Sequence, residues 1–276
     1  MRGLPRRAGG LHQLPTIRTA RPVRRGAASP RLAAVRRCSF GCYGEAGPVK
    51  INHCEQGSHE WWDARVGIPS ASNFFRIIQP VKGELSKQAD TYIDELIADR
   101  LSGTPSDVGA MTSRAMEDGI NREPEARQWY RESHTDMMME EVREVGFVTT
   151  DDGASGCSPD GLIHRLTGDE WIPVRGLELK CPLLKTHIGY LRDGGLPSAY
   201  RIQVHGAMAI TGLPWDFASW VPDVYGVPPL LIRLEPDEFT EKVRDALAQF
   251  AERYSQAWTQ FESMRLEPVA DESHPF

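Results

Sequence analysis

The spacing of apolar residues changes along the chain, from a helical period in its first half to alternation in its middle. In residues 87–101 the apolar positions recur three and four residues apart, which predicts an amphipathic helix. Further helices are expected over about 55–80, in two parts, and over about 112–133. A meander of three strands separated by Asp and Gly turns is then expected over residues 141–149, 157–164 and 171–180.

The last third of the chain returns to helices. Helices are expected over about 183–192 and 198–212, with a long closing helix over about 237–263. Strands at 216–222 and 229–235 lie between them. This order of elements predicts an α/β fold, in which a mixed β-sheet is flanked by helices.

Two proline-containing stretches affect the predicted helices. Residues 67–72 (Gly-Ile-Pro-Ser-Ala-Ser) end one helix and offer serine hydroxyls as caps for a second that begins near Ser72. Pro124 lies within the helix expected at 112–133. It either kinks this helix or marks the first turn of a helix that starts near Asn121.

Charge separates the first 48 residues from the rest. Residues 1–44 contain ten arginines and no Asp, Glu or Lys. Subtracting these ten from the 32 basic residues of the 276-residue chain leaves 22 against 38 acidic ones in residues 45–276, a net charge of −16. We therefore expect residues 1–48 to be a disordered segment and 49–276 to form one domain. A transit peptide or an upstream start codon also fits residues 1–48, and we favour disorder or mis-start over targeting.

Composition points to a soluble, cytoplasmic protein without a disulfide framework. No stretch approaches the roughly 20 apolar residues of a membrane span, so we expect no membrane association. The five cysteines are odd in number and irregular in spacing. The set Cys38, Cys42, His53 and Cys54 does not have the spacing of a usual zinc finger, so no zinc site is expected there.

The strongest chemical signal lies between residues 157 and 182. Asp160 closes a Ser-Pro-Asp-Gly turn, and Glu178 and Lys180 lie two apart in a short apolar run. Because side chains alternate along a strand, Glu178 and Lys180 project from the same face. Two carboxylates and a lysine on a sheet edge are the groups needed to hold a divalent metal and to orient a water beside it.

Four segments of the chain form a recognisable set: residues 62–72, the Gly119-x-x-x-Glu123-Pro124-x-Ala126 block, residues 157–161 with 176–182, and Tyr200-x-x-Gln203-Val204. Together they resemble a known family, the lambda-type phage exonucleases, also called YqaJ-like viral recombinases, within the PD-(D/E)xK nucleases. The resemblance covers roughly residues 58–212 and implies a restriction-endonuclease-like core.

The resemblance also implies a role for each matching residue. Asp160 and Glu178 would ligate the catalytic Mg²⁺, for which Mn²⁺ substitutes, with the Leu179 carbonyl as a backbone ligand. Lys180, whose pKa can fall beside a metal, would orient or help to deprotonate the attacking water. The remaining positions are Glu123 as an outer acidic group, Gln203 beside the water or the cleaved phosphate, and Arg65 with Ser72 at the 5′-terminal phosphate.

The function that follows from this resemblance is a Mg²⁺-dependent exonuclease. It would hydrolyse one strand of linear duplex DNA from a 5′ end, exposing 3′ single strands for an annealing protein in recombination. A ring-like homotrimer around the DNA is implied as well. The alternatives are a PD-(D/E)xK endonuclease or junction resolvase and a catalytically inactive DNA-binding module, which the intact Asp160, Glu178 and Lys180 set argues against.

Several of these residues also have structural interpretations. Arg65 could pair with Asp63 or Glu60 on its own helix. Glu123 could complement a helix dipole, Gln203 could be an exposed helix residue, and Ser72 could only cap a helix. Packing or structural roles are favoured for Cys157, Cys181, His205 and at least one of Trp61 and Trp62.

The chain departs from the family pattern at two places. The segment 161–176 between the two halves of the motif is longer than expected, and we interpret it as a lengthened hairpin on the rim of the DNA channel. Pro69 and Ser70 replace the more usual residues between Ile68 and Ala71, which weakens the 5′-phosphate assignment.

Overall fold

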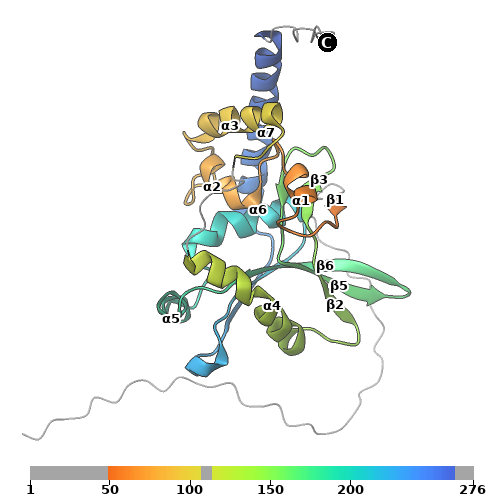
Figure 1. The fold of residues 1–276 in the computed structure, drawn as a ribbon, viewed down its shortest axis with the longest axis vertical. Helices are drawn as coiled ribbons and strands as arrows, with labels where there is room; N and C mark the ends of the chain where they lie inside the picture. Colours follow the sequence, from red (N-terminus) through yellow and green to blue (C-terminus); the bar gives the residue numbers. More distant parts are fainter. Residues whose placement is uncertain (1–48, 107–113, 265–276) are drawn as a thin grey trace, which may run out of the picture. The chain divides into compact units, whose positions relative to one another are not determined.

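A computed structural model describes residues 49–106 and 114–264 (Figure 1). The predicted segment 1–48 lies outside the described residues. The described residues belong to one compact unit, Cys42–Phe276.

The order of helices and strands agrees closely with the expected order. The α-helices are α1 (His59–Asp63), α2 (Phe74–Ile77), α3 (Ala89–Ser102), α4 (Arg114–His134), α5 (Leu184–Asp193), α6 (Arg201–Thr211) and α7 (Glu238–Met264). The strands are β1 (Val49–Asn52), β2 (Glu140–Arg143), β3 (Phe147–Thr150), β4 (Gly156–Cys157), β5 (Gly161–Thr167), β6 (Glu170–Lys180), β7 (Trp215–Ser219) and β8 (Leu230–Leu234).

A five-stranded mixed sheet carries the motif strand. Its order is β2-β5-β6-β7-β8, and β6 pairs parallel with β7, whereas the other neighbours are antiparallel. The parallel pair requires a crossover, which α5 and α6 provide between β6 and β7. This arrangement confirms the predicted mixed sheet flanked by helices.

The long segment between the halves of the motif is a β-hairpin. Strands β5 and β6 pair from Gly161↔Leu177 out to Thr167↔Glu170, with an irregularity in register between Ile163 and His164. Gly168 turns the chain with a φ of 63°, a left-handed conformation that favours glycine. The interpretation of residues 161–176 as a lengthened hairpin is confirmed, and its place relative to DNA stays a prediction.

The expected single meander is wrong, because its strands divide between two sheets. The predicted strand 141–149 contains β2 of the large sheet and β3 of a second sheet, whose order is β1-β3-β4. The predicted strand 157–164 is likewise split into β4 and β5, with Pro159 between them. Strand β1, which pairs antiparallel with β3, was not predicted.

Apolar side chains pack on both faces of the large sheet. Trp215 and Phe217 on β7 join the larger core beneath α2, α3, α6 and α7, the helices that gather on one side in Figure 1. Leu177 and Leu179 on β6 join a smaller core with Ala126 and Tyr130 of α4. Since side chains alternate along β6, Glu178 faces the α6 side and its two neighbours face the α4 side.

The local signals before the sheet are partly confirmed. Pro124 lies inside α4, so the helix does not begin near Asn121. Ser70 precedes a short 3₁₀ helix, Ala71–Asn73, but its side chain does not cap it. The Ser70 hydroxyl instead lies 3.1 Å from the Ser72 hydroxyl, which corrects the expected capping role. Among the described residues, no helix is both long and apolar enough to cross a membrane.

Candidate functional site

Asp160 is held against the end of β6 by main-chain contacts. Its backbone N–H donates to the Leu177 carbonyl at 3.0 Å, and its Oδ2 accepts from the Leu179 N–H at 2.6 Å. These contacts place the Asp160 carboxyl beside the segment that carries Glu178. The two halves of the sequence motif therefore meet as predicted.

Glu178 lies on the opposite face of β6 from Leu179 and is only 3% exposed. Its Oε1 accepts a hydrogen bond from Gln203 Nε2 of α6 at 2.6 Å and forms an ion pair with Lys180. The Lys180 ammonium also lies 5.4 Å from the ring centroid of Tyr200. The structure thus brings Glu178, Lys180 and Gln203 together.

Glu123 approaches the same cluster from α4. Burial raises the pKa of Glu123 to about 7, and the charge of Asp160 adds to the rise. Burial likewise raises the pKa of Glu178 to about 7, although the nearby Lys180 opposes the shift. Both shifts have the same origin, because three acidic groups share a poorly solvated region with one lysine.

The charged groups around Lys180 oppose the effect of its burial. Burial would lower its pKa, but the charges of Glu178 and Asp160 outweigh burial and raise the pKa of Lys180. The neighbouring carboxylates therefore favour the charged form of the Lys180 side chain. A charged ammonium beside Glu178 is suited to orienting a water, and the choice between the two predicted roles of Lys180 stays a prediction.

The donor set fits a hydrated Mg²⁺ better than a closed metal cage. Within residues 49–106 and 114–264, no three His, Cys, Asp or Glu side chains are arranged to hold a metal ion. Mg²⁺ commonly keeps several waters and is bound through one or two carboxylates together with substrate phosphates. Asp160 and Glu178 provide such oxygens, and a bound cation would favour the ionised forms of these carboxyls, whose pKa values are raised by burial.

Ser72 and Arg65 are linked to this cluster through Ser70. Ser72 lines a small cavity of about 30 Å³ together with Glu178 and Gln203. The Ser72 hydroxyl contacts the Ser70 hydroxyl, toward which Arg65 Nη2 donates at 3.4 Å. A chain of contacts through the Ser70 hydroxyl thus connects Arg65 to Ser72, which lines the cavity beside Glu178.

The comparisons with known proteins identify the family. The model of the YqaJ-like viral recombinase domain matches residues 60–214, more than half of the chain. The chain belongs to the YqaJ-like viral recombinase family. All eight candidate residues, from Arg65 to Gln203, lie inside the matched segment.

Solved structures support the same relationship. The YqaJ-like chain is similar to an alkaline exonuclease (LHK-Exo) from Laribacter hongkongensis, with 30% identity and a TM-score of 0.55 over 75% of this chain and 100% of that chain. The structure of LHK-Exo in complex with dAMP gives 29% identity and a TM-score of 0.56 over the same shares. The resemblance to lambda-type exonucleases and the restriction-endonuclease-like fold are confirmed. No curated protein matches the chain.

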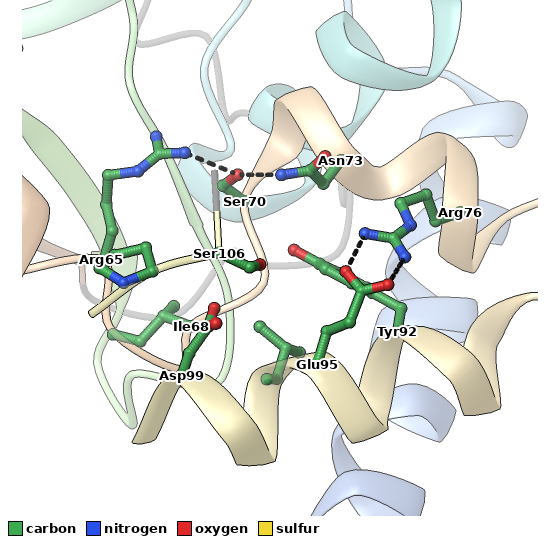
Figure 2. A pocket seen from close by; sticks show the side chains of 11 residues that line it. Arg65, Ile68, Ser70, Asn73, Arg76, Tyr92, Glu95, Asp99 and Ser106 are labelled. Carbon is green, nitrogen blue, oxygen red and sulfur yellow. Dashed lines mark hydrogen bonds and ion pairs between the residues drawn. The ribbon is translucent and has the colours of Figure 1, made fainter. Parts of the chain in front are cut away.

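Arg65 also lines a pocket of about 170 Å³ in the YqaJ-like domain, and Figure 2 shows the side chains that line it. Asn73 Nδ2 lies 3.5 Å from the Ser70 hydroxyl, and Arg76 Nη1 donates to Glu95 Oε2 at 2.6 Å. Sequence reasoning missed Asn73 and Arg76. Both lie just after residues 62–72, and their closeness to this block is the feature of the sequence that could have drawn attention to them.

Trp61, which directly precedes this block, has structural contacts. The Trp61 indole N–H donates to the Gly146 carbonyl and to the Ser158 hydroxyl, both at 2.9 Å. The guanidinium carbon of Arg65, a residue only 8% exposed, lies 4.2 Å from the centroid of the Trp61 ring. Trp61 therefore supports Arg65 and the turn before Asp160, in agreement with the packing role favoured for one tryptophan.

The other flanking residues also pack as the structural interpretation predicted. Cys157 and Cys181 are buried, and burial raises the pKa of both thiols, to about 12 for Cys181. His205 Nδ1 lies 2.8 Å from the hydroxyl of Thr240 in α7, where it joins two helices. The possible zinc ligands Cys38 and Cys42 lie outside the described residues.

Proposed function

We propose that this YqaJ-like protein is a Mg²⁺-dependent exonuclease that hydrolyses one strand of linear duplex DNA in the 5′-to-3′ direction. The observation that carries the proposal is the meeting of Asp160, Glu178 and Lys180 at one end of β6, with Gln203 bonded to Glu178 at 2.6 Å. The similarity to an alkaline exonuclease over 100% of that chain supports the same reaction class.

The chemistry assigned to these residues is phosphodiester hydrolysis. Asp160, Glu178 and the Leu179 carbonyl would hold Mg²⁺ or Mn²⁺, which when bound neutralises charge on the phosphate and lowers the pKa of a water. Lys180, a charged donor, would orient a water for in-line attack. Gln203 fixes the Glu178 carboxylate through its side-chain amide. Glu123, on α4, adds an outer acidic group.

The proposed polarity rests on Arg65 and Ser72. A guanidinium offers planar, charge-assisted donors that suit a terminal phosphate, and a hydroxyl adds a neutral donor. Ser72 lines the cavity that contains Glu178, and Arg65 is connected to Ser72 through Ser70. A 5′-phosphate held here lies close to the candidate metal site. The dAMP bound by LHK-Exo is consistent with a nucleotide product.

The proposed partners are duplex DNA with free ends and a single-strand annealing protein, with a homotrimer as the assembly and the cytoplasm as the compartment. A PD-(D/E)xK endonuclease or junction resolvase would use the same metal chemistry with a different grip on DNA. A catalytically inactive DNA-binding module would bind no catalytic metal and would not hydrolyse DNA.

The release of nucleotides from uniformly labelled linear duplex DNA tests the reaction class. We expect Mg²⁺-dependent release by the wild-type protein, loss of at least about 10²-fold in Glu178→Ala, and no change in Glu170→Ala. Glu170 is the matched control because it is an exposed acid at the other end of β6. Equal inertness of the wild-type and Glu178→Ala proteins would leave the inactive DNA-binding module as the better account.

The choice of substrate separates the exonuclease from the endonuclease. An exonuclease leaves covalently closed circular duplex intact and degrades the same DNA after linearisation. Arg65→Ala should slow degradation of 5′-phosphorylated ends more than that of 5′-hydroxyl ends. Cleavage of the circle at the rate of the linear form would reject the end-dependent function.

A further inference from the structure

Arg127 is a nearly buried cation at the candidate metal site that the sequence motifs did not indicate. It lies on α4 one helical turn after Glu123, and its side chain is 12% exposed. Its Nε donates to the main-chain carbonyl of Asp160 at 2.9 Å, and its Nη1 lies 3.1 Å from Glu144 Oε2. The two arms of the guanidinium therefore bind two different segments.

Hydrogen bonds from two elements, β6 and α4, hold Asp160 in place. Leu177 and Leu179 bind the Asp160 N–H and carboxylate from β6, which fixes Asp160 relative to the strand of Glu178. Arg127 binds the Asp160 carbonyl from α4, the helix that carries Glu123. The guanidinium thus links the two elements whose carboxylates approach each other across the site.

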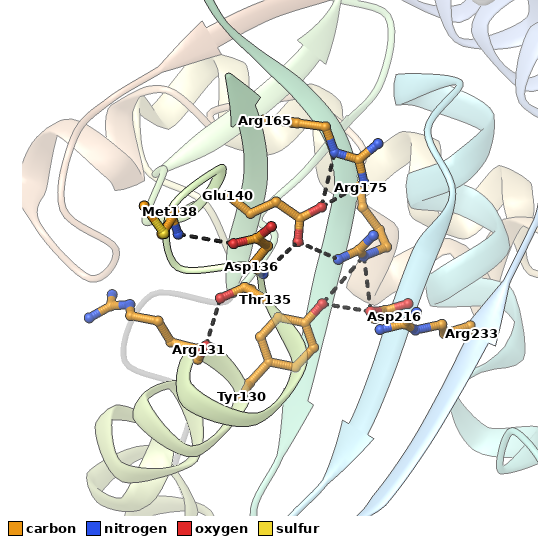
Figure 3. A network of polar contacts seen from close by, with 10 residues as sticks. All are labelled: Tyr130, Arg131, Thr135, Asp136, Met138, Glu140, Arg165, Arg175, Asp216 and Arg233. Atoms are coloured by element: carbon orange, nitrogen blue, oxygen red, sulfur yellow. Dashed lines mark hydrogen bonds and ion pairs between the residues drawn. The ribbon is translucent and has the colours of Figure 1, made fainter. Parts of the chain in front are cut away.

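A purely structural role for Arg127 is the competing explanation. Its ion-pair partner Glu144 is 67% exposed, and an ion pair with an exposed partner contributes little to stability because water screens the charges. Independent contacts also anchor α4. Tyr130 donates to the fully buried Asp216 at 2.6 Å, and Asp216 accepts from Arg175 at 3.0 Å (Figure 3). The distinctive contribution of Arg127 is therefore at Asp160.

The positive charge of Arg127 also supports a role at Asp160. The Arg127 guanidinium brings a positive charge from α4 to the Asp160 turn, one helical turn from Glu123. A cation at this position favours the ionised forms of the two carboxylates, and its Nε holds the main-chain carbonyl of Asp160 in place.

We propose that Arg127 is a positioning residue of the candidate metal site, where its guanidinium ties the Asp160 turn to α4 and so sets Asp160 relative to Glu123. This inference rests on the proposed metal-dependent function. Groups that orient metal ligands without touching the metal typically change metal affinity by 10- to 100-fold when they are removed.

Calorimetric titration of the metal-free, full-length protein with Mn²⁺ tests the proposal. Arg127→Met should raise the Mn²⁺ dissociation constant by about tenfold or more. Arg127→Lys should also weaken Mn²⁺ binding, because lysine keeps the charge and loses the fork. Arg131→Met is the matched control, an exposed arginine one turn further along α4 that should bind Mn²⁺ as the wild type does.

Urea unfolding and a Mg²⁺ titration of nucleotide release accompany the calorimetry. We expect both Arg127 variants to need more Mg²⁺ for half-maximal rate and to regain rate at high Mg²⁺. A folded Arg127→Met protein with wild-type Mn²⁺ affinity overturns the proposal, and if that variant does not fold, the same criterion applies to Arg127→Lys. A wild-type protein that neither binds Mn²⁺ nor releases nucleotides refutes the proposed function itself, whereas an active wild type with unaffected variants refutes only the role of Arg127.

Discussion

Replacing Glu178 with glutamine should stabilise the metal-free protein at pH 8 while abolishing its activity. Glu178 is 3% exposed, and its pKa is raised from 4.5 to about 7, chiefly by burial. Its ionised form is therefore disfavoured in the folded state relative to the unfolded chain. Glutamine has nearly the same shape as the protonated acid and can accept the hydrogen bond from Gln203.

The magnitude follows from the linkage between protonation and folding. The protonated form of Glu178 contributes to the free energy of unfolding because its pKa is raised in the folded state. This contribution is fully present below 4.5, the pKa in the unfolded chain, and is lost as pH rises through about 7. At about 1.4 kcal/mol per pH unit, this range corresponds to roughly 3 kcal/mol. Lys180 and Asp160 respond to the same change, so we expect the Gln variant to gain between about 1 and 3 kcal/mol at pH 8.

Urea unfolding in EDTA at pH 5 and at pH 8 is the assay. The wild type should lose stability relative to Glu178→Gln as pH rises, and Glu170→Gln should follow the wild type because Glu170 is exposed. Mg²⁺ at pH 8 should stabilise the wild type and leave Glu178→Gln unchanged. A Gln variant that is less stable than the wild type at pH 8 without metal would refute the reasoning, since the ion pair with Lys180 would then outweigh burial.

Two further predictions concern the framework of the site. A Cβ added at Gly176 would lie 2.1 Å from Trp215 Cζ3, so Gly176→Ala should lower the free energy of unfolding by about 1–3 kcal/mol, whereas Gly189→Ala on α5, with nothing within 4 Å, should be neutral or stabilising in the same urea assay. Tyr130→Phe removes the hydrogen bond to the fully buried Asp216, part of the network in Figure 3, and should destabilise by about 1–3 kcal/mol; a wild-type unfolding midpoint would show that this hydrogen bond contributes nothing to stability.

Local sequence patterns correctly predicted the features that depend on a single helix or strand. The apolar spacing over 87–101 predicted α3 because Tyr92, Ile93, Leu96 and Ile97 are the residues that pack into the core. Alternation along β6 correctly placed Glu178 and Lys180 on one face, since that geometry is set by the strand alone. The pairing of Asp160 with this strand could be predicted because both segments belong to one hairpin.

Long-range contacts explain what the sequence did not reveal. The division of the meander into two sheets depends on β1, which lies about a hundred residues before its partner β3 and is only four residues long. The role of Arg127 depends on the Asp160 carbonyl, 33 residues away, and an arginine on a charged helix has no local mark that distinguishes it. The charges of both Glu178 and Asp160 raise the pKa of Lys180, and Asp160 lies outside β6, so strand geometry alone could not indicate this shift.

Strand-resolved degradation of linear duplex DNA tests the central claim most directly. Each strand is labelled at its 5′ end in one substrate and at its 3′ end in another, and label release is followed with Mg²⁺, with EDTA, and with Asp160→Asn. We predict that Mg²⁺ supports early release of the 5′ label as a mononucleotide while the 3′ label remains in long single strands, and that EDTA or Asp160→Asn abolishes release. Early release of the 3′ label, or release that continues in EDTA, would contradict the account.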